Sequence, residues 1–152
     1  MEYNIELLEQ PAQSVLSIRT RAAVGDLPQV LGNAFGAIML YLGEIGEHPL
    51  GAPFVAYYNM DMQNLDIEIG FPVPGMLPGK NEIKPSEIPA GKQVSCIHKG
   101  PYNQLEPAYN AVLQWIGENG YTATGTAYEF YLNDPGKTPE SELLTKIVFP
   151  LT

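Results

Sequence analysis

Residues 66–72 read Asp-Ile-Glu-Ile-Gly-Phe-Pro, and residues 144–150 read Leu-Thr-Lys-Ile-Val-Phe-Pro. Both stretches have the residue pattern of a strand that closes on Phe-Pro, and Phe149 follows Phe71 by 78 positions. The helical runs that precede them also open alike, with Asp-Leu-Pro-Gln from residue 26 and Asn-Gln-Leu-Glu-Pro from residue 103. The chain therefore contains two copies of one unit, and we expect a central groove along the pseudo-twofold axis that relates them.

The residue pattern predicts the element order β-α-β-β twice. Because helices must cover one face of an antiparallel sheet, the expected class is α+β, an antiparallel sheet with two main helices. Pro11 interrupts the first strand, and the Pro- and Gly-rich residues 74–89 are expected to form a loop between the halves. The expected strands are 5–8, 14–20, 54–59, 65–73, 91–98, 126–132 and 143–149, with helices between caps at 26 and 46 and at 103 and 120.

Both helices carry start and stop signals. Asp26 with Gln29, and Asn103 with Glu106, match the capping box, in which the two side chains satisfy backbone N–H groups reciprocally. A glycine ends each helix, at positions 46 and 120. The apolar faces recur at spacings of three and four, with Leu31, Phe35, Ile38, Leu42 and Ile45 on the first helix and Leu105, Ala108 or Tyr109, Val112 and Ile116 on the second.

Length and charge bound the class of protein. With 152 residues, one domain over 1–152 is expected, with repeat halves of about 1–74 and 88–152. The net charge of −9 would repel a phosphate backbone, so direct nucleic-acid binding is not expected. Residues 1–4 carry no leader pattern and no 18-residue apolar stretch exists, so we expect a cytoplasmic protein. No P-loop, GxGxxG, HExxH or GxSxG motif is present, so no cofactor is expected.

Glu129 stands among aromatic residues in a predicted strand, in the run Tyr-Glu-Phe-Tyr from residue 128. Strand alternation places it, with Asp66, Glu68 and Lys146, on the sheet face away from the helices. If that carboxylate lines a groove of rings, loss of hydration raises its pKa and it seeks a cation or a donor. The alternative is a glutamate on a solvated strand face.

Three tyrosines are candidate partners of Glu129. Tyr131 lies two residues on and shares its face. The repeat gives Tyr58 the matching place in the first half, with Ala56 where Glu129 stands in the second. Tyr102 precedes the second helix and either reaches the groove or staples the helix start. Ordinary sheet packing is the alternative for Tyr58 and Tyr131.

Other polar positions carry weaker signals. Glu68 and Lys146 correspond in the repeat and either pair or, as favoured here, stay solvated. Cys96, the single cysteine, and His98 share a strand face, where an activated thiol pair or half a metal site is outweighed by a buried cysteine and a structural histidine. No metal is expected. Core packing is the first interpretation of Tyr109 and Trp115 on the second helix.

The order of several short motifs resembles the gyrase-inhibitor-like small-molecule-binding family, whose domain is also the effector-binding part of AraC-type and MerR-type multidrug regulators. The motifs are Ile-Pro-Ala-Gly-Lys from 88, His-Lys-Gly-Pro-Tyr from 98, Tyr121, Tyr-Glu-Phe-Tyr-Leu-Asn-Asp-Pro from 128, and residues 66–73. The resemblance implies two swapped β-α-β-β repeats around a groove. It also implies that Glu129 is the family's central acidic residue, which meets cationic or polar aromatic ligands beside stacking tyrosines.

Three functions follow as expectations. The first is a stand-alone protein that binds hydrophobic, often cationic, multi-ring compounds through Glu129, Tyr131, Tyr58, Tyr102 and Glu68. The second, implied by hydrolase members of the family, is an enzyme that opens cyclopropane rings of natural products with Glu129 and either Tyr131 or Tyr102. The third is a gyrase-binding inhibitor or a partner of a separate regulator. No DNA-binding segment is evident in the 152 residues, so a complete one-component regulator is not expected.

Overall fold

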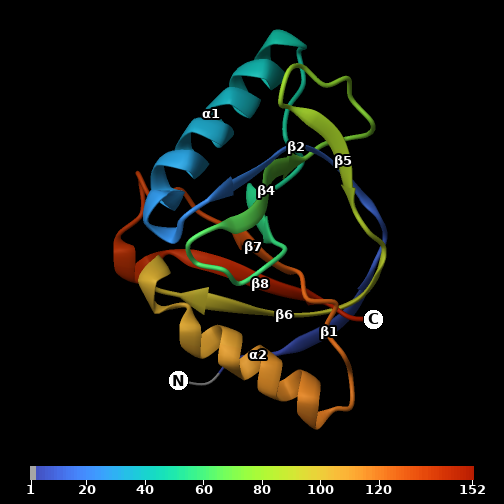
Figure 1. Cartoon of the computed structure of the whole chain (residues 1–152), viewed down its shortest axis with the longest axis vertical. Coiled ribbons are helices and arrows are strands. Elements are labelled where there is room, and N and C mark those ends of the chain that lie inside the picture. The colour runs from blue at the N-terminus through green and yellow to red at the C-terminus, as the bar shows by residue number, and fades with distance from the viewer. Residues whose placement is uncertain (1–2) are drawn as a thin grey trace. The chain divides into compact units, whose positions relative to one another are not determined.

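The computed structural model describes residues 3–152, so Met1 and Glu2, which open the segment without a leader pattern, lie outside it. Within those residues the chain runs β-β-α-β-β twice (Figure 1). This order confirms the α+β class. The elements are β1 (Glu6–Gln10), β2 (Gln13–Ala22), α1 (Leu27–Glu44), β3 (Phe54–Tyr57), β4 (Leu65–Pro72), β5 (Lys84–Ile88), β6 (Gly91–Lys99), α2 (Glu106–Glu118), β7 (Ala127–Tyr131) and β8 (Leu144–Pro150).

The chain packs as two compact units. The N-terminal unit is Ala12–Pro89, and the C-terminal unit joins the residues up to Pro11 to Ala90–Thr152. In the N-terminal unit the antiparallel strand order is β3-β4-β2-β5, and in the C-terminal unit it is β7-β8-β6-β1. The repeat inferred from Phe-Pro is therefore a repeat of topology. The single domain over 1–152 and the groove between the repeats stay predictions.

Each unit contains one strand that belongs, by its position in the sequence, to the other repeat. β1 directly precedes β2 but pairs with β6, while β5 directly precedes β6 but pairs with β2. The prediction of a loop over 74–89 is therefore wrong for Lys84–Ile88. Its sequence, Lys-Pro-Ser-Glu-Ile, hides a strand because Pro85 lacks an N–H, which an outer strand tolerates.

The helix starts differ from the predicted capping boxes. Asp26 makes no side-chain cap hydrogen bond, and its φ of −96° and ψ of −5° are already helical, whereas a capping side chain needs an extended backbone. α2 begins at Glu106 with Leu105 as its cap, so Asn103 falls in a preceding 3-10 turn. Both helices instead begin one residue before a proline, which loses no hydrogen bond in a first turn.

The helix ends confirm the predicted glycine stops. Gly46 and Gly120 have φ angles of +73° and +74°, a conformation that glycine adopts without strain. The backbone N–H groups of the following residues, Glu47 and Tyr121, donate back into the helix to Leu42 and Ile116 at 2.8 and 3.0 Å. Both ends are Schellman-type caps, so this feature repeats in structure as it does in sequence.

Each helix lays its apolar face on its own sheet. In the N-terminal unit Ile38 and Leu42 are buried on α1, and the Phe35 ring meets the Phe71 ring edge-on at 5.5 Å. On α2 the buried position goes to Ala108 rather than Tyr109, with Val112 and Ile116 completing the face. The apolar faces are thus confirmed. Among residues 3–152, no helix has both the length and the apolar character needed to cross a membrane.

Gly70 supplies a stability test of the N-terminal unit. A Cβ atom at this position in β4 would lie 2.4 Å from the Leu16 carbonyl oxygen and 2.9 Å from the Ser17 Cβ atom. We expect Gly70→Ala to lower the free energy of unfolding by about 1–3 kcal/mol because the neighbouring strand must move. Gly32→Ala is the control: it meets no atom within 4 Å and should raise helix stability by up to about 1 kcal/mol. Urea unfolding followed by circular dichroism measures both, and equal stabilities would contradict the packing argument.

Candidate functional site

Glu129 faces α2, not the opposite side of the sheet. In β7 it pairs with Ile147 of β8, which belongs to the core beneath α2, whereas Lys146 pairs with Phe130. The predicted shared face of Glu129 and Lys146 is therefore wrong. In β7 the alternate positions Ala127 and Glu129 point inward, so Glu129 holds a place where alternation expects an apolar residue.

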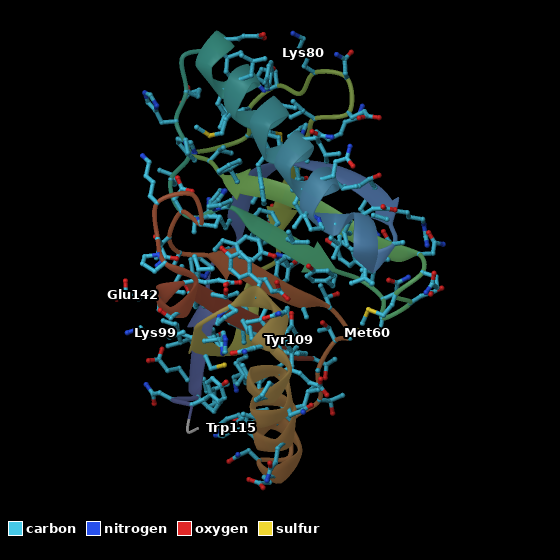
Figure 2. All side chains as sticks on the ribbon, turned by 90° about the vertical axis from the view of Figure 1, so that its left-hand side faces the viewer. Met60, Lys80, Lys99, Tyr109, Trp115 and Glu142 are labelled. Atoms are coloured by element: carbon cyan, nitrogen blue, oxygen red, sulfur yellow. The ribbon has the colours of Figure 1, made fainter. Side chains whose placement is uncertain are left out.

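Two phenol hydroxyls hold the Glu129 carboxylate. Tyr131 donates to Oε1 at 2.8 Å, and Tyr109 donates to Oε2. Figure 2 shows Tyr109 near the start of α2 and Trp115 further along the helix. Glu129 is only 7% exposed. Burial raises the pKa of Glu129 above its ordinary value, while the hydrogen bonds from Tyr109 and Tyr131 oppose that rise.

Aromatic rings surround this carboxylate. The Tyr102 ring lies 5.3 Å from the Tyr131 ring, and the Tyr109 ring meets Phe149 edge-on at 5.7 Å. Burial and the charges of Asp134 and Glu129 raise the pKa of Tyr102, so its hydroxyl stays protonated. We name Glu129, Tyr102, Tyr109 and Tyr131 the Glu129 cluster. All three tyrosines are only partly buried, so their rings retain surface that a ligand can cover.

Tyr109 is a site residue that the sequence pattern assigns to the core. Its ring does pack on Phe149, but its hydroxyl reaches Glu129. The signal was the ambiguity between Ala108 and Tyr109 on the apolar face: Ala108 is fully buried, which leaves Tyr109 at the margin of that face. Trp115, also expected in the core, stacks on Tyr121 at 5.8 Å.

The repeat correspondence is also shifted by one residue. Glu129 pairs with Ile147 in the C-terminal unit, and in the N-terminal unit the residue that pairs with Ile69 is Val55. Since Ile69 and Ile147 correspond through the Phe-Pro strands, Val55 takes the place of Glu129. The predicted matches of Ala56 and Tyr58 are therefore wrong, and Tyr57, which pairs with Ile67, takes the place of Tyr131. The distance along the chain from the helix-ending glycine to the strand is the same in both repeats, so the repeats differ instead in the length of the helix and of the turn before the Phe-Pro strand.

Glu68 and Tyr58 form a second cluster, within the N-terminal unit. Tyr58 donates its hydroxyl to Glu68 Oε1, and Ser17 donates to Oε2 at 2.5 Å. Glu68 is 9% exposed, so the expectation of a solvated side chain is wrong. Of the five candidate ligand-binding residues, Glu129, Tyr131 and Tyr102 therefore meet in one unit, while Tyr58 and Glu68 meet in the other.

His98 and Cys96 have structural surroundings. Burial raises the pKa of the Cys96 thiol to about 11, which contradicts an activated thiol. His98 is buried, and its Nδ1 lies 3.1 Å from the Tyr3 hydroxyl. Within residues 3–152, His98 Nε2 and the Thr145 hydroxyl, on paired positions of β6 and β8, have no hydrogen-bond partner. The same residues contain no group of three or more His, Cys, Asp or Glu side chains that could hold a metal ion.

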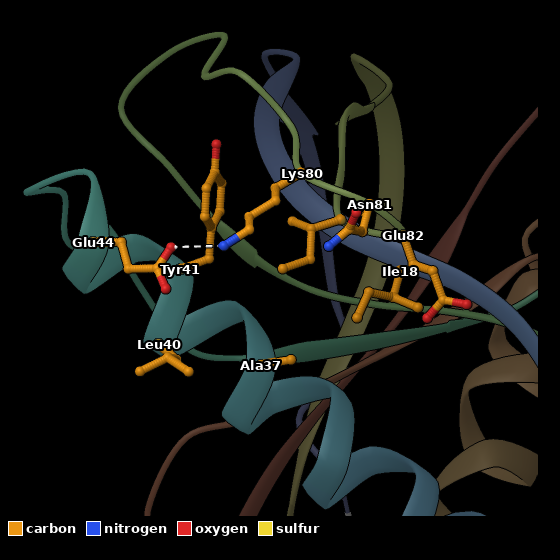
Figure 3. Close-up of a pocket in the computed structure, with 9 residues that line it drawn as sticks. Ile18, Ala37, Leu40, Tyr41, Glu44, Lys80, Asn81 and Glu82 are labelled. Atoms are coloured by element: carbon orange, nitrogen blue, oxygen red, sulfur yellow. Dashed lines mark hydrogen bonds and ion pairs between the residues drawn. The ribbon is translucent and has the colours of Figure 1, made fainter.

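A shallow pocket of about 260 Å³ lies in the N-terminal unit between α1 and the loop around Lys80 (Figure 3). Lys80 and Glu44 form an ion pair at 3.1 Å on its rim, and Ile18, Ala37 and Leu40 supply apolar walls. None of the predicted site residues lines it. Since its one basic group is already paired with its neighbour, we do not place the function there.

Comparisons with known proteins agree with the resemblance. A family model described as the GyrI-like small molecule binding domain matches residues 3–152. The EcmrR C-terminal domain is 27% identical, with a TM-score of 0.82 over 100% of this chain and 99% of that one. EcmrR in its complex with DNA is also 27% identical, with a TM-score of 0.85 over 98% of this chain. Of that EcmrR chain, this chain spans only 57%.

Two more distant structures share the fold alone. SAV2435 bound to tetraphenylphosphonium is 15% identical with a TM-score of 0.61, over 100% of this chain and 94% of that one. A hydrolase from Listeria innocua is 14% identical with a TM-score of 0.72, over 97% of this chain and 91% of that one. No curated protein matches the chain.

Glu129→Gln tests the burial of the carboxylate. Since the pKa of Glu129 is raised in the folded protein, its stabilising contribution is complete below the ordinary value of 4.5 and is lost as pH rises through the folded pKa. We expect the wild type to lose stability relative to Glu129→Gln by about 1.4 kcal/mol for each pH unit between the two pKa values. Urea unfolding at a series of pH values measures this. Glu9→Gln, on the exposed β1, controls for the lost charge, and parallel curves for wild type and Glu129→Gln would contradict the raised pKa.

Proposed function

Because the chain belongs to the GyrI-like small-molecule-binding family, we propose that it binds hydrophobic, often cationic, multi-ring compounds at the Glu129 cluster. One observation carries this proposal: a carboxylate that is 7% exposed lies among partly buried tyrosine rings. Structural glutamates rarely occupy such positions unless they are paired with a cation. Here both carboxylate oxygens accept from phenols, and no Lys or Arg in residues 3–152 forms an ion pair with Glu129 within 4 Å.

The cluster suits an organic cation for two physical reasons. An ionised carboxylate in a poorly hydrated site attracts a positive charge more strongly than one in water. The faces of tyrosine rings add a quadrupole attraction of about 0.5–2 kcal/mol each. Apolar contact contributes about 25 cal/mol for each Å² removed from water, before ordering costs. Micromolar affinity for a compound of several rings is therefore reasonable.

Tyr109 and Tyr131 would then orient the carboxylate. In the ligand-free protein their hydroxyls stabilise the ionised form of Glu129 and fix its direction. A bound cation would approach the same oxygens, and Tyr102 would offer a further ring. The tetraphenylphosphonium bound by SAV2435, a cation with four rings, is of the chemical class that this arrangement would accept.

A second candidate function is hydrolysis, which the raised pKa of Glu129 favours. A carboxylate with that pKa is a better general base at neutral pH, and a neighbouring tyrosine, Tyr131 or Tyr102, could donate a proton. Water would add its oxygen to a ring carbon of an electrophilic cyclopropane. The electrons of the broken C–C bond would pass to the conjugated acceptor, which then takes up a proton.

Gyrase binding, the third expected function, stays a prediction. No contact among the described residues argues for it.

Titration calorimetry with a matched pair of compounds tests the binding proposal. Tetraphenylphosphonium carries the charge, and neutral triphenylphosphine oxide is a similar multi-ring compound without it. We expect Glu129→Gln to weaken binding of the cation about tenfold or more, a loss of about 1.4 kcal/mol, and to change binding of the neutral compound little. Affinity of the wild type for the cation should rise with pH through the raised pKa of Glu129, because a proton competes with the ligand.

Two results would contradict the charge role of Glu129. One is equal cation affinity for wild type and Glu129→Gln, and the other is a pH dependence that survives in the variant. Tyr109→Phe is the matched control for the site, since it keeps the ring that packs on Phe149 but removes one donor to the carboxylate. Losing that donor should raise the pKa of Glu129 further, so the rise of cation affinity should move to higher pH.

Mass spectrometry separates the hydrolase from the binding protein. The wild type is incubated with a panel of electrophilic cyclopropane compounds, and products heavier by one water are sought. Turnover by the wild type that is lost in Glu129→Gln and slowed in Tyr131→Phe would support hydrolysis. Binding of the panel without any hydrated product would leave small-molecule binding as the function.

A further inference from the structure

In the second cluster, the face of the Tyr58 ring is already covered by a positively charged side chain. In the N-terminal unit the Arg19 guanidinium lies over the Tyr58 ring, with its Cζ atom 3.9 Å from the ring centroid. β2 and β3 both flank β4, so Arg19, Glu68 and Tyr58 meet on the face of that sheet. This face is opposite the one that packs on α1, because Ile67 and Ile69 alternate with Glu68 in β4.

The groups around Arg19 are those that recognise an organic cation. The ring of Tyr58 is tied through its hydroxyl to the buried Glu68, and Ser17 completes the hold on that carboxylate. Asp66 accepts from Arg19 Nε and a terminal nitrogen at 2.7 and 2.8 Å. One carboxylate and one aromatic face therefore contact the guanidinium, and the second carboxylate, Glu68, holds the ring that the guanidinium covers. A carboxylate beside an aromatic face is the chemistry by which proteins bind guanidinium and ammonium ligands.

Arg19 is nevertheless loosely held on its outer side. Its side chain is 55% exposed, and an exposed ion pair of this kind contributes little to stability. The hydrogen bond to Asp66 is the main reason that the pKa of Arg19 is raised, and Tyr58 and Glu68 make smaller contributions. Without Arg19, Asp66 would keep only Arg21, at 3.8 Å, as a positively charged partner in the described chain.

We propose that Tyr58, Glu68 and Asp66 form a second cation-binding site, which the protein fills with its own Arg19 and which a planar organic cation enters by displacing that side chain. This site goes beyond the function proposed for Glu129, and it does not depend on it. A ligand with several rings gains from covering more of Tyr58 than a guanidinium does, since apolar area adds to the charge attraction. The incoming cation also restores the neutralisation of Asp66 that Arg19 gives up.

The test uses 9-aminoacridinium as a planar cation and is made in a Glu129→Gln background, so that the result does not depend on the Glu129 cluster. Arg19→Ala removes the internal occupant, and Arg21→Ala is the matched control, since it removes an equal charge beside Asp66 but not over Tyr58. We expect Arg19→Ala to tighten binding about tenfold and Arg21→Ala to change it less than about threefold. Calorimetry gives the affinities.

Further readouts locate the probe. In the Arg19→Ala protein, 9-aminoacridinium should shift the Tyr58 ring resonances in an NMR titration, and adding Glu68→Gln should reverse most of the gain in affinity. Arg19→Gln serves as the second variant if Arg19→Ala does not fold. Equal affinity changes for the Arg19 and Arg21 variants, or an unchanged Tyr58 spectrum at saturating probe, would overturn the proposal. Both outcomes leave the tetraphenylphosphonium test of Glu129 unaffected.

Discussion

The carboxylate of Glu129 occupies a position that alternation along β7 would give to an apolar side chain. Removing an ionised carboxylate from water is costly unless donors or a cation compensate. Here the donors are two phenols, one from α2 and one from the same strand, and the described residues supply no ion-pair partner. Helix, strand and carboxylate are therefore linked in one unit. Burial of the carboxylate raises the pKa of Glu129, and the two donated hydrogen bonds oppose that rise.

The two units meet the same problem in different ways. Glu68 is also buried and also bound by a tyrosine, but its second donor is Ser17 and its neighbourhood contains Arg19. It lies on the face of its sheet away from α1, whereas Glu129 faces α2. Duplication has thus kept the backbone topology and separated the chemistry: one unit leaves its carboxylate to a ligand in our proposal, and the other provides an internal cation.

Strand exchange explains why the units do not coincide with the halves of the sequence. β1 lies beside β2 in the sequence but pairs with β6 of the second repeat, and β5 lies beside β6 but pairs with β2 of the first. Pairing of this kind joins residues far apart in the sequence, such as Glu6 with Ser95 and Gln13 with Ile88, and no local pattern encodes it. The strand over Lys84–Ile88 has no local signal for the same reason, since it is defined by its pairing partner and not by an apolar pattern of its own.

Local sequence patterns predict the β-α-β-β core of each repeat, the helix faces, the glycine stops and the candidate carboxylate, but not the additional strand β5. These features depend on interactions within a few residues: 3.6- and 2-residue periodicity, and the conformational freedom of glycine at Gly46 and Gly120. The sequence also indicates Tyr131, which lies two residues after Glu129, and Tyr102, which lies just before α2.

The face on which Glu129 lies, and the side chains that reach it, follow from strand pairing and helix packing. A register shift of one residue turns every side chain of a strand to the other face, and register is fixed by pairing with β8 rather than by β7 alone. Tyr109 became a site residue because the placement of α2 on the sheet brings its hydroxyl to the carboxylate. Contacts between elements distant in sequence have no local signal, because they depend on how whole faces pack.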